Sequence, residues 1–325
     1  MNKLFRYGFL LSLLLMACMA RAAAPDRQNV ATQSPPSDPS SKKAVGIIAG
    51  GVNGTYIRIA ADMATVLETD ELRVLAIVGK GSVQNIDDLL YIKGVDMAIV
   101  QSDVLEYLKR QGTYKDIEKR ISYIAKLYNE EFHLIARSEI DNLNDLAGKK
   151  VNFDVKGSGT AITATTLFDT LKVTVEPTYF DQTTALDKLK SGEIAALVYV
   201  AGKPAPLFEK ITAADKLHFL PIDHTPALLE TYLPTSLSHQ DYPILIQADR
   251  EVRTVAVGAV LAAYNWKRYF NRYQKVADFV THFFDHFNDF QQSSHHPKWR
   301  EISLSAVIPG WTRFPAAQEW LEKNR

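Results

Sequence analysis

The chain has 325 residues, of which 37 are basic and 37 acidic, and it contains a single cysteine. Residues 1–22 hold three basic side chains and no acid, so the remainder carries a formal charge of −3. This charge argues against a surface for nucleic acid or anionic membranes. The length fits two domains, which must form without an internal disulfide.

The N-terminus has the pattern of a secretory signal peptide over residues 1–24. Lys3 and Arg6 precede an apolar stretch at 9–16 that is too short to span a bilayer, and 20–24 contains two small-x-small cleavage patterns. Residues 15–18 also resemble a bacterial lipobox, in which Cys18 would become the lipidated first residue. The alternative is that Cys18 is only a small apolar side chain. We therefore expect a periplasmic protein, either free or lipid-anchored through Cys18.

Residues 25–43 are rich in Pro, Ser, Asp and Gln without apolar periodicity, which predicts a disordered linker. An α/β pattern begins at residue 44. We expect a first lobe over 44–138, a second lobe over 139–225, and a return to the first lobe with C-terminal helices over 226–325. Alternating strands and helices predict mainly parallel sheets in both lobes.

The expected elements follow one another in chain order. Apolar runs predict strands at 45–49, 73–78, 95–100, 121–127, 132–137, 151–155, 194–200, 217–222 and 252–261. Helices are expected after the glycine turns, after Ser102 as an N-cap, after a capping box at 184–187, and over the aromatic stretch 275–291.

Two glycine turns are the strongest functional signal. Residues 51–56 and 156–160 each follow a strand pattern and open a helical one. Each turn therefore presents free backbone N–H groups and a hydroxyl at a helix N-terminus, which is a seat for an anion. An ordinary tight turn with an N-cap is the alternative for either turn alone. Two such seats predict two lobes that close on one small anionic ligand.

Polar residues at the ends of the strands complete the expected site, because ligands of such sheets bind beyond the carboxyl ends of the strands. The candidate substrate-binding residues are Asn53, Gly54, Thr55, Tyr56, Ser82, Gln101, Ser102, Asp103, Tyr128, Ser158, Gly159, Thr160 and Tyr199. For Tyr56 and Tyr199, packing in the core is the alternative to lining the cleft.

Charged residues near these turns have less specific roles. Lys80, Lys156 and Lys203 are expected to be exposed and to steer an anion by their field. Glu130 and Glu131 are expected to be solvated, with contact to a ligand amino group as the alternative. We expect no metal site and no cofactor.

From residue 45 to 321 the chain resembles TAXI-type solute-binding proteins, the extracytoplasmic components of TRAP transporters. The resemblance lies in the order and spacing of short motifs. These are GGVNGTY at 50–56, GSVQN at 81–85, AIVQSDV at 98–104, LYNEE at 127–131, DLAGKKV at 145–151, GSGT at 157–160, HPKWRE at 296–301 and PGWTRF at 309–314. Val52 and Asn53 depart from the small residues expected in the first turn, which puts the identity of the ligand in doubt.

The resemblance implies a type II periplasmic-binding-protein fold, with two α/β lobes and a ligand cleft between them. It also implies that a small organic anion is captured, such as a dicarboxylate, an oxoacid or an acidic amino acid like glutamate, for a TRAP-type membrane permease. We expect a monomer that catalyses no reaction and closes by a hinge near 136–140 and 223–252. A ligand sensor for a signalling receptor and an enzyme on the same fold remain alternatives.

Overall fold

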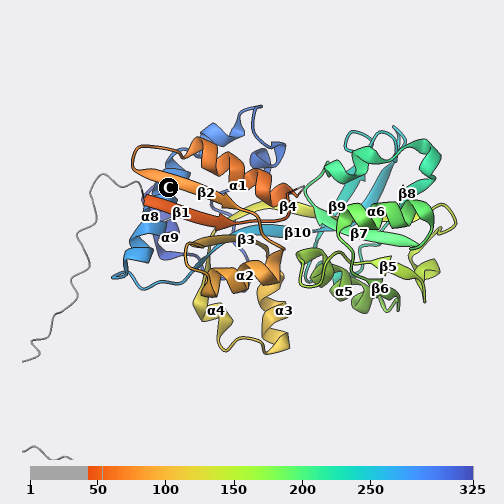
Figure 1. Cartoon of the computed structure of the whole chain (residues 1–325), viewed down its shortest axis with the longest axis horizontal. Coiled ribbons are helices and arrows are strands. Elements are labelled where there is room, and N and C mark those ends of the chain that lie inside the picture. The colour runs from red at the N-terminus through yellow and green to blue at the C-terminus, as the bar shows by residue number, and fades with distance from the viewer. Residues whose placement is uncertain (1–42, 53, 325) are drawn as a thin grey trace, which may run out of the picture. The chain divides into compact units, whose positions relative to one another are not determined.

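The computed structural model describes residues 43–52 and 54–324 (Figure 1). The predicted signal peptide, Cys18 and Asn53 lie outside the described residues. So does the predicted linker except for Lys43, which begins strand β1.

The described chain is a two-lobed α/β structure built on one ten-stranded sheet. The strands lie in the order β2-β1-β3-β10-β4-β7-β5-β6, with β8 paired to β4 and β9 paired to β10. Strands β1, β2 and β3 are parallel, as are β5, β6 and β7. This is the type II periplasmic-binding-protein fold, as expected.

The first lobe combines both ends of the described chain. Its strands are β1 (Lys43–Ile48), β2 (Leu72–Ile77) and β3 (Met97–Gln101). Its helices are α1 (Thr55–Val66), α2 (Ser82–Tyr91), α3 (Val104–Gln111), α4 (Ile117–Arg120), α8 (Asn271–Asp285) and α9 (Pro315–Lys323), with 3-10 turns at Phe287–Gln291 and Pro297–Glu301.

The second lobe is formed by the middle of the chain. Its strands are β5 (Lys150–Asn152), β6 (Glu176–Thr178), β7 (Ala196–Ala201), β8 (Leu217–Phe219) and β9 (Leu233–Ser238). Its helices are α5 (Gly159–Leu171), α6 (Gln182–Ser191) and α7 (Pro226–Leu229), with 3-10 turns at Leu143–Leu146, Pro206–Lys210 and Ala213–Asp215.

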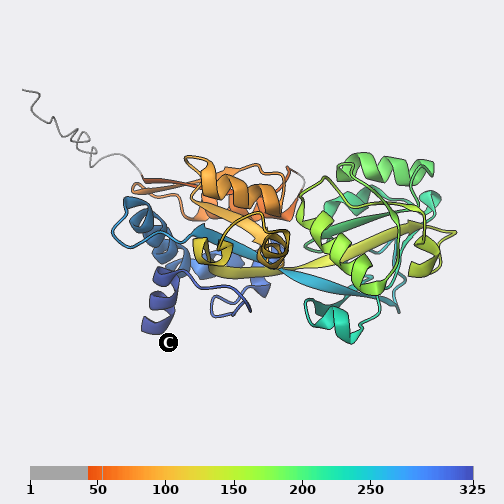
Figure 2. The ribbon, with the colours of Figure 1, turned by 90° about the horizontal axis from the view of Figure 1, so that it is seen from below.

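Two long antiparallel strands, β4 (Ile121–Arg137) and β10 (Glu251–Tyr264), run through both lobes (Figures 1 and 2). The prediction of two strands at 121–127 and 132–137 was wrong, because one continuous strand covers both. In β4, pairing with β7 begins at Glu131, which lies opposite Ala256 of β10. The strands therefore pass between the lobes near these residues, outside the hinge segments expected from the sequence.

Each lobe has its own apolar core. Side chains of successive strand residues point to opposite faces, so the sheet packs against apolar clusters on both faces. In β1, Ile47 packs in the cluster beneath α1 and α8, whereas Ile48 packs in the cluster on the other face. In β4, Leu127 belongs to a first-lobe cluster and Phe132 to a second-lobe cluster. Ile162 of α5 packs in the cluster that contains Ile48, so the lobes also touch there.

Three boundaries differ from the sequence-based expectation. Asp103, not Ser102, occupies the N-cap of α3, and no side chain caps that helix. Asp181 caps α6 through the N–H groups of Thr183 and Thr184, so the capping box expected at 184–187 does not open the helix. The aromatic helix ends at Asp285 and continues as a 3-10 turn.

None of the described helices is long and apolar enough to cross a bilayer.

Candidate functional site

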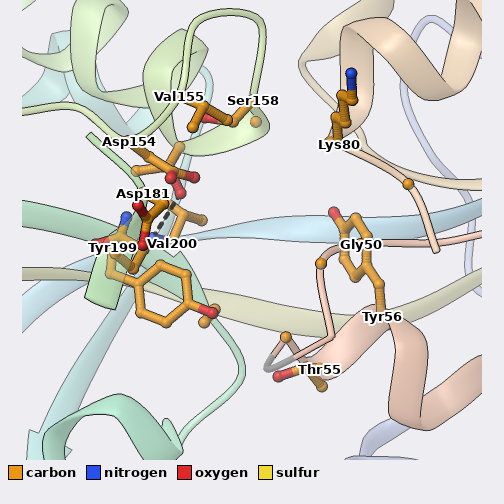
Figure 3. Close-up of a pocket in the computed structure, with 18 of the residues that line it drawn as sticks. Gly50, Thr55, Tyr56, Lys80, Asp154, Val155, Ser158, Asp181, Tyr199 and Val200 are labelled. Carbon is orange, nitrogen blue, oxygen red and sulfur yellow. Dashed lines mark hydrogen bonds between the residues drawn. The ribbon is translucent and has the colours of Figure 1, made fainter. Parts of the chain in front are cut away.

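A cavity of about 730 Å³ lies where the two lobes face each other. Figure 3 shows Thr55, Tyr56 and Lys80 on the first-lobe side, and Asp154, Ser158 and Tyr199 on the second-lobe side. The candidate residues that line this cavity are Gly54, Thr55, Tyr56, Ser82, Gln101, Ser158, Gly159, Thr160 and Tyr199. The structure thus brings both glycine turns to one cavity.

The first glycine turn leaves the start of α1 open. The N–H of Gly54 donates to the carbonyl of Gly51 over 2.9 Å, and α1 begins at the next residue without a side-chain cap. The first N–H groups of a helix have no partner within the helix. Because Thr55 and Tyr56 both line the cavity, this helix end is available to a ligand anion.

The second glycine turn is more tightly built. Ser158 is the N-cap of α5, and its Oγ accepts a hydrogen bond from the N–H of Ala161 over 3.1 Å. The hydroxyl oxygen of Thr160 accepts from the N–H of Val200 over 3.1 Å. Both oxygens therefore already accept a hydrogen bond, and the side chain of Ser158 also bonds Asp154. The hydroxyl hydrogen of Thr160 and the N–H groups of the first turn other than that of Ala161 can donate to a ligand.

A third glycine turn holds the two lobes in contact beside the cavity. The N–H of Val83 donates to the carbonyl of Gly157 over 3.2 Å. Gly81 has φ of +118°, and a Cβ on it would lie 2.8 Å from the Cα of Ser158. A Cβ on Gly159 would lie 2.2 Å from Oε1 of Gln101. Only glycine permits this approach of the backbones.

Glu130 is a buried carboxyl group that lines the cavity. It is 3% exposed, and it accepts a hydrogen bond from the hydroxyl of Tyr56 over 2.6 Å. Burial raises its pKa to about 8, and the neighbouring carboxylate of Glu131 adds to the rise. The expectation that Glu130 is solvated was wrong.

Glu131 is equally buried, but the protein itself neutralises it. Its carboxylate pairs with Nζ of Lys298 over 2.8 Å and accepts from the N–H of Lys203 over 3.0 Å. Lys298 is itself only 1% exposed. The ion pair ties the C-terminal segment to β4, and the hydrogen bond ties β4 to the residues that follow β7. Glu131 is therefore not solvated either.

Asp154 is a second cavity-lining acid, which the sequence reading missed. It follows β5 with φ of +66°, a conformation that Asp tolerates better than most residues. Burial raises its pKa to about 6, an effect that hydrogen bonds from Val155, Ser158 and Gln182 oppose. Its carboxylate lies beside Tyr199 on the second-lobe side of the cavity (Figure 3).

Three candidate residues do not line the cavity. Ser102 uses its backbone to bond Gly258 and Trp311. Tyr128 is fully buried in the first-lobe core. Asp103 accepts hydrogen bonds from the hydroxyls of Thr163 and Tyr232, over 2.9 and 3.4 Å, and so joins the two lobes behind the cavity.

Exposed cations surround the cavity. Lys80 and Lys156 are exposed, as expected, and they also line the cavity. Nζ of Lys203 instead donates to Ser236 and pairs with Asp241 at 3.1 Å. Arg58 and Lys210 also line it and were missed. Arg58 lies in the first turn of α1, next to the glycine turn, and this proximity was the available signal.

The fold and cavity together define a two-lobed protein of the periplasmic-binding type. The chain matches the NMT1-like family over residues 47–308 and belongs to that family.

A solved structure described as a periplasmic transporter is 14% identical to this chain, with a TM-score of 0.52. The match covers 86% of this chain and 93% of the chain in that structure. This similarity concerns the fold alone. The alkanesulfonate-binding protein SsuA from Xanthomonas axonopodis pv. citri, bound to MOPS, is 12% identical, with a TM-score of 0.46. The match covers 80% of this chain and 82% of SsuA. The amino acid ABC transporter substrate-binding protein AbpA from Streptococcus pneumoniae, bound to L-arginine, is 15% identical, with a TM-score of 0.41. The match covers 75% of this chain and 90% of AbpA.

Proposed function

We propose that this protein is a solute-binding protein that captures a small organic anion between its lobes. One observation carries the proposal: the N-terminal ends of α1 and α5, from different lobes, line the same cavity. A carboxylate at these ends would accept charge-assisted hydrogen bonds of about 1.5–3 kcal/mol each. Arg58, Lys80 and Lys156 add positive charge at the rim.

The ligand would be a dicarboxylate, an oxoacid or an acidic amino acid, delivered to a TRAP-type membrane permease as in TAXI proteins. Export through the predicted signal peptide, with or without a lipid at Cys18, would place the protein in the periplasm. The choice of ligand and permease rests on the sequence resemblance, and export rests on the residue pattern of the N-terminus. We further propose binding without catalysis.

A thermal-shift screen of organic acids and amino acids, followed by calorimetry, tests the proposal. A ligand at one hundred times its dissociation constant stabilises the folded form by about 2.7 kcal/mol, which is easily detected. We expect at least one small carboxylate to bind with one-to-one stoichiometry and to be recovered unchanged. Turnover of the ligand would identify an enzyme, and failure of every carboxylate to bind would overturn the proposal.

A further inference from the structure

The cavity is not uniformly basic. Its lining cations Arg58, Lys80, Lys156 and Lys210 are all exposed at the rim, whereas Glu130 is buried at its floor. A ligand with only negative charge would have to lie near the carboxyl group of Glu130. The arrangement of charge therefore indicates a ligand with two different ends.

Glu130 has no cationic partner in the protein. Among residues 43–52 and 54–324, no lysine, arginine or histidine forms an ion pair with it, and the hydrogen bond that the structure shows to it comes from Tyr56. Glu131, the next residue of β4, points to the other face and is paired with Lys298. A buried carboxylate without a counter-charge is costly, so a cation from elsewhere would stabilise its charged form.

Two further groups complete a place for that cation. Asp154 and Tyr199 line the same cavity as Glu130. Burial raises the pKa of the Tyr199 hydroxyl, and the nearby negative charges of Asp154 and Glu130 add to the rise. The Tyr199 ring extends from the second-lobe side of the cavity toward the first lobe (Figure 3). Carboxylates beside an aromatic ring are suited to an ammonium group, which the ring attracts by its face.

We propose that Glu130 is the specificity-determining residue of the cavity and that it binds an ammonium group of the ligand. This inference rests on the proposed function, in which the helix ends bind a carboxylate. The ligand is then a zwitterion, an amine that also carries a carboxylate. Asp154 and Tyr199 assist Glu130 on the second-lobe side.

Matched ligands test the inference. Calorimetry would compare amino acids with the 2-oxo, 2-hydroxy and unsubstituted acids of the same skeleton, for example glutamate with 2-oxoglutarate and glutarate. We expect the tightest ligand to carry an amine and to bind at least tenfold better than its amine-free partners. In Glu130→Gln this preference should fall at least tenfold, through weaker binding of the amine.

Glu176→Gln is the matched control, because Glu176 is exposed in β6, outside the cavity, and the substitution removes the same charge. It should leave the preference unchanged. Asp154→Asn should reduce the preference in the same direction as Glu130→Gln. Thermal melts would verify that each variant is folded.

The outcomes separate this inference from the proposed function. If carboxylates bind but the amine confers no advantage, or if Glu130→Gln weakens the oxoacid instead, the ammonium assignment is wrong and anion capture stands. If no carboxylate binds, with or without an amine, both are wrong.

Discussion

At the scale of single residues, the neighbouring glutamates of β4 show how burial and pairing divide one short segment into two roles. Glu131 is held by Lys298, 167 positions later in the chain. Glu130 lines the cavity with only neutral groups hydrogen-bonded to it. Besides burial, its pKa responds to hydrogen bonds from Tyr56 of α1 and Gln101 of β3 and to the negative charges of Glu131 and Asp103. Its own charge in turn raises the pKa values of the buried hydroxyls of Tyr128 and Tyr199, and Val257 lies opposite it in β10.

This burial predicts a pH-dependent difference in stability between Glu130→Gln and the native protein without ligand. The folded-state pKa of Glu130, about 8, lies above the ordinary glutamate pKa of 4.5. The folded protein therefore holds this proton more tightly than the unfolded chain does, and the resulting stabilisation is lost as pH rises from 4.5 through 8. Glutamine does not titrate, so the variant should gain stability relative to native protein over this range, by a few kcal/mol at pH 8.5.

Denaturant unfolding at pH 5, 7 and 8.5 measures this difference. Asp154, whose pKa is also raised by burial, acts in the same direction in both proteins and cancels in the comparison. The buried His133, whose pKa is lowered to about 4, cancels likewise. Asp103, whose pKa burial also raises, interacts with the charge of Glu130, so its titration changes in the variant and adds to the difference in the same direction. A stability difference that does not change with pH would contradict the assignment of a buried, uncompensated carboxyl.

Two substitutions of Ser158 distinguish its role as a helix cap from the binding of an anion at the same helix end. Ser158→Ala removes the acceptor for the N–H of Ala161 and should cost about 1 kcal/mol, which is a fall of about 2–4 °C in melting temperature for a domain of 150–250 residues. Ser158→Asp keeps a capping oxygen, so its stability should stay closer to native. Its added negative charge at the second seat should weaken binding of a carboxylate ligand at least tenfold. Normal affinity of the Asp variant by calorimetry would rule out an anion at this helix end.

At the scale of elements, the strand–turn–helix units could be predicted because their signals are local. An apolar run, a glycine turn and a helical period lie within about 20 residues, as in 45–67. β9 was missed because it pairs only with β10, shows little alternation of burial, and contains Pro234, which occurs on edge strands. The continuity of β4 was missed because Asn129, Glu130 and Glu131 interrupt its apolar pattern.

The contents of the cavity could be predicted only in part, because side-chain partners come from distant segments. Both glycine turns were found from the sequence alone. Asp103 was expected to face the ligand, but its partners Thr163 and Tyr232 lie 60 and 129 positions away. Asp154 was missed because a single aspartate after a strand resembles any turn residue.

A substitution in the turn before α2 should prevent the contact between the two lobes. Gly81→Ala would place a Cβ against the backbone of Ser158, so the turns at 79–82 and 157–159 should separate. We expect ligand affinity to fall at least tenfold. Gly112→Ala is the control, because Gly112 has φ of +62° with open space around its Cα. Both variants should lose stability through backbone strain, about 1–2 kcal/mol for Gly112→Ala in the left-handed region and about 1–3 kcal/mol for Gly81→Ala, whose ψ of −179° lies in a region that only glycine adopts readily. Only Gly81→Ala should bind poorly. Equal affinities in the two variants would show that this contact has no part in ligand capture.

At the scale of the whole molecule, the chain crosses between its lobes on β4 and β10, and each lobe keeps its own core. Such a construction permits the lobes to move as units about the crossing strands. Direct contacts also join them, at Val83 with Gly157 and at Asp103 with Thr163. Ile162 of α5 also packs in the cluster that contains Ile48, so the junction has an apolar part as well. A ligand that bridges the two lobes adds contacts to this arrangement and can shift their equilibrium.

Ligand binding should therefore favour the closed arrangement. A ligand shifts a conformational equilibrium only by its difference in affinity for the two states, and only the closed state lets one small molecule reach both the end of α1 and the end of α5. Solution scattering should show a smaller radius of gyration with saturating ligand than without it. Gly81→Ala should show a smaller decrease at the same fractional occupancy, because its turns cannot meet. An unchanged scattering profile at saturation in the native protein would mean that the ligand is bound without closure, and the helix ends of the two lobes would then not act on it together.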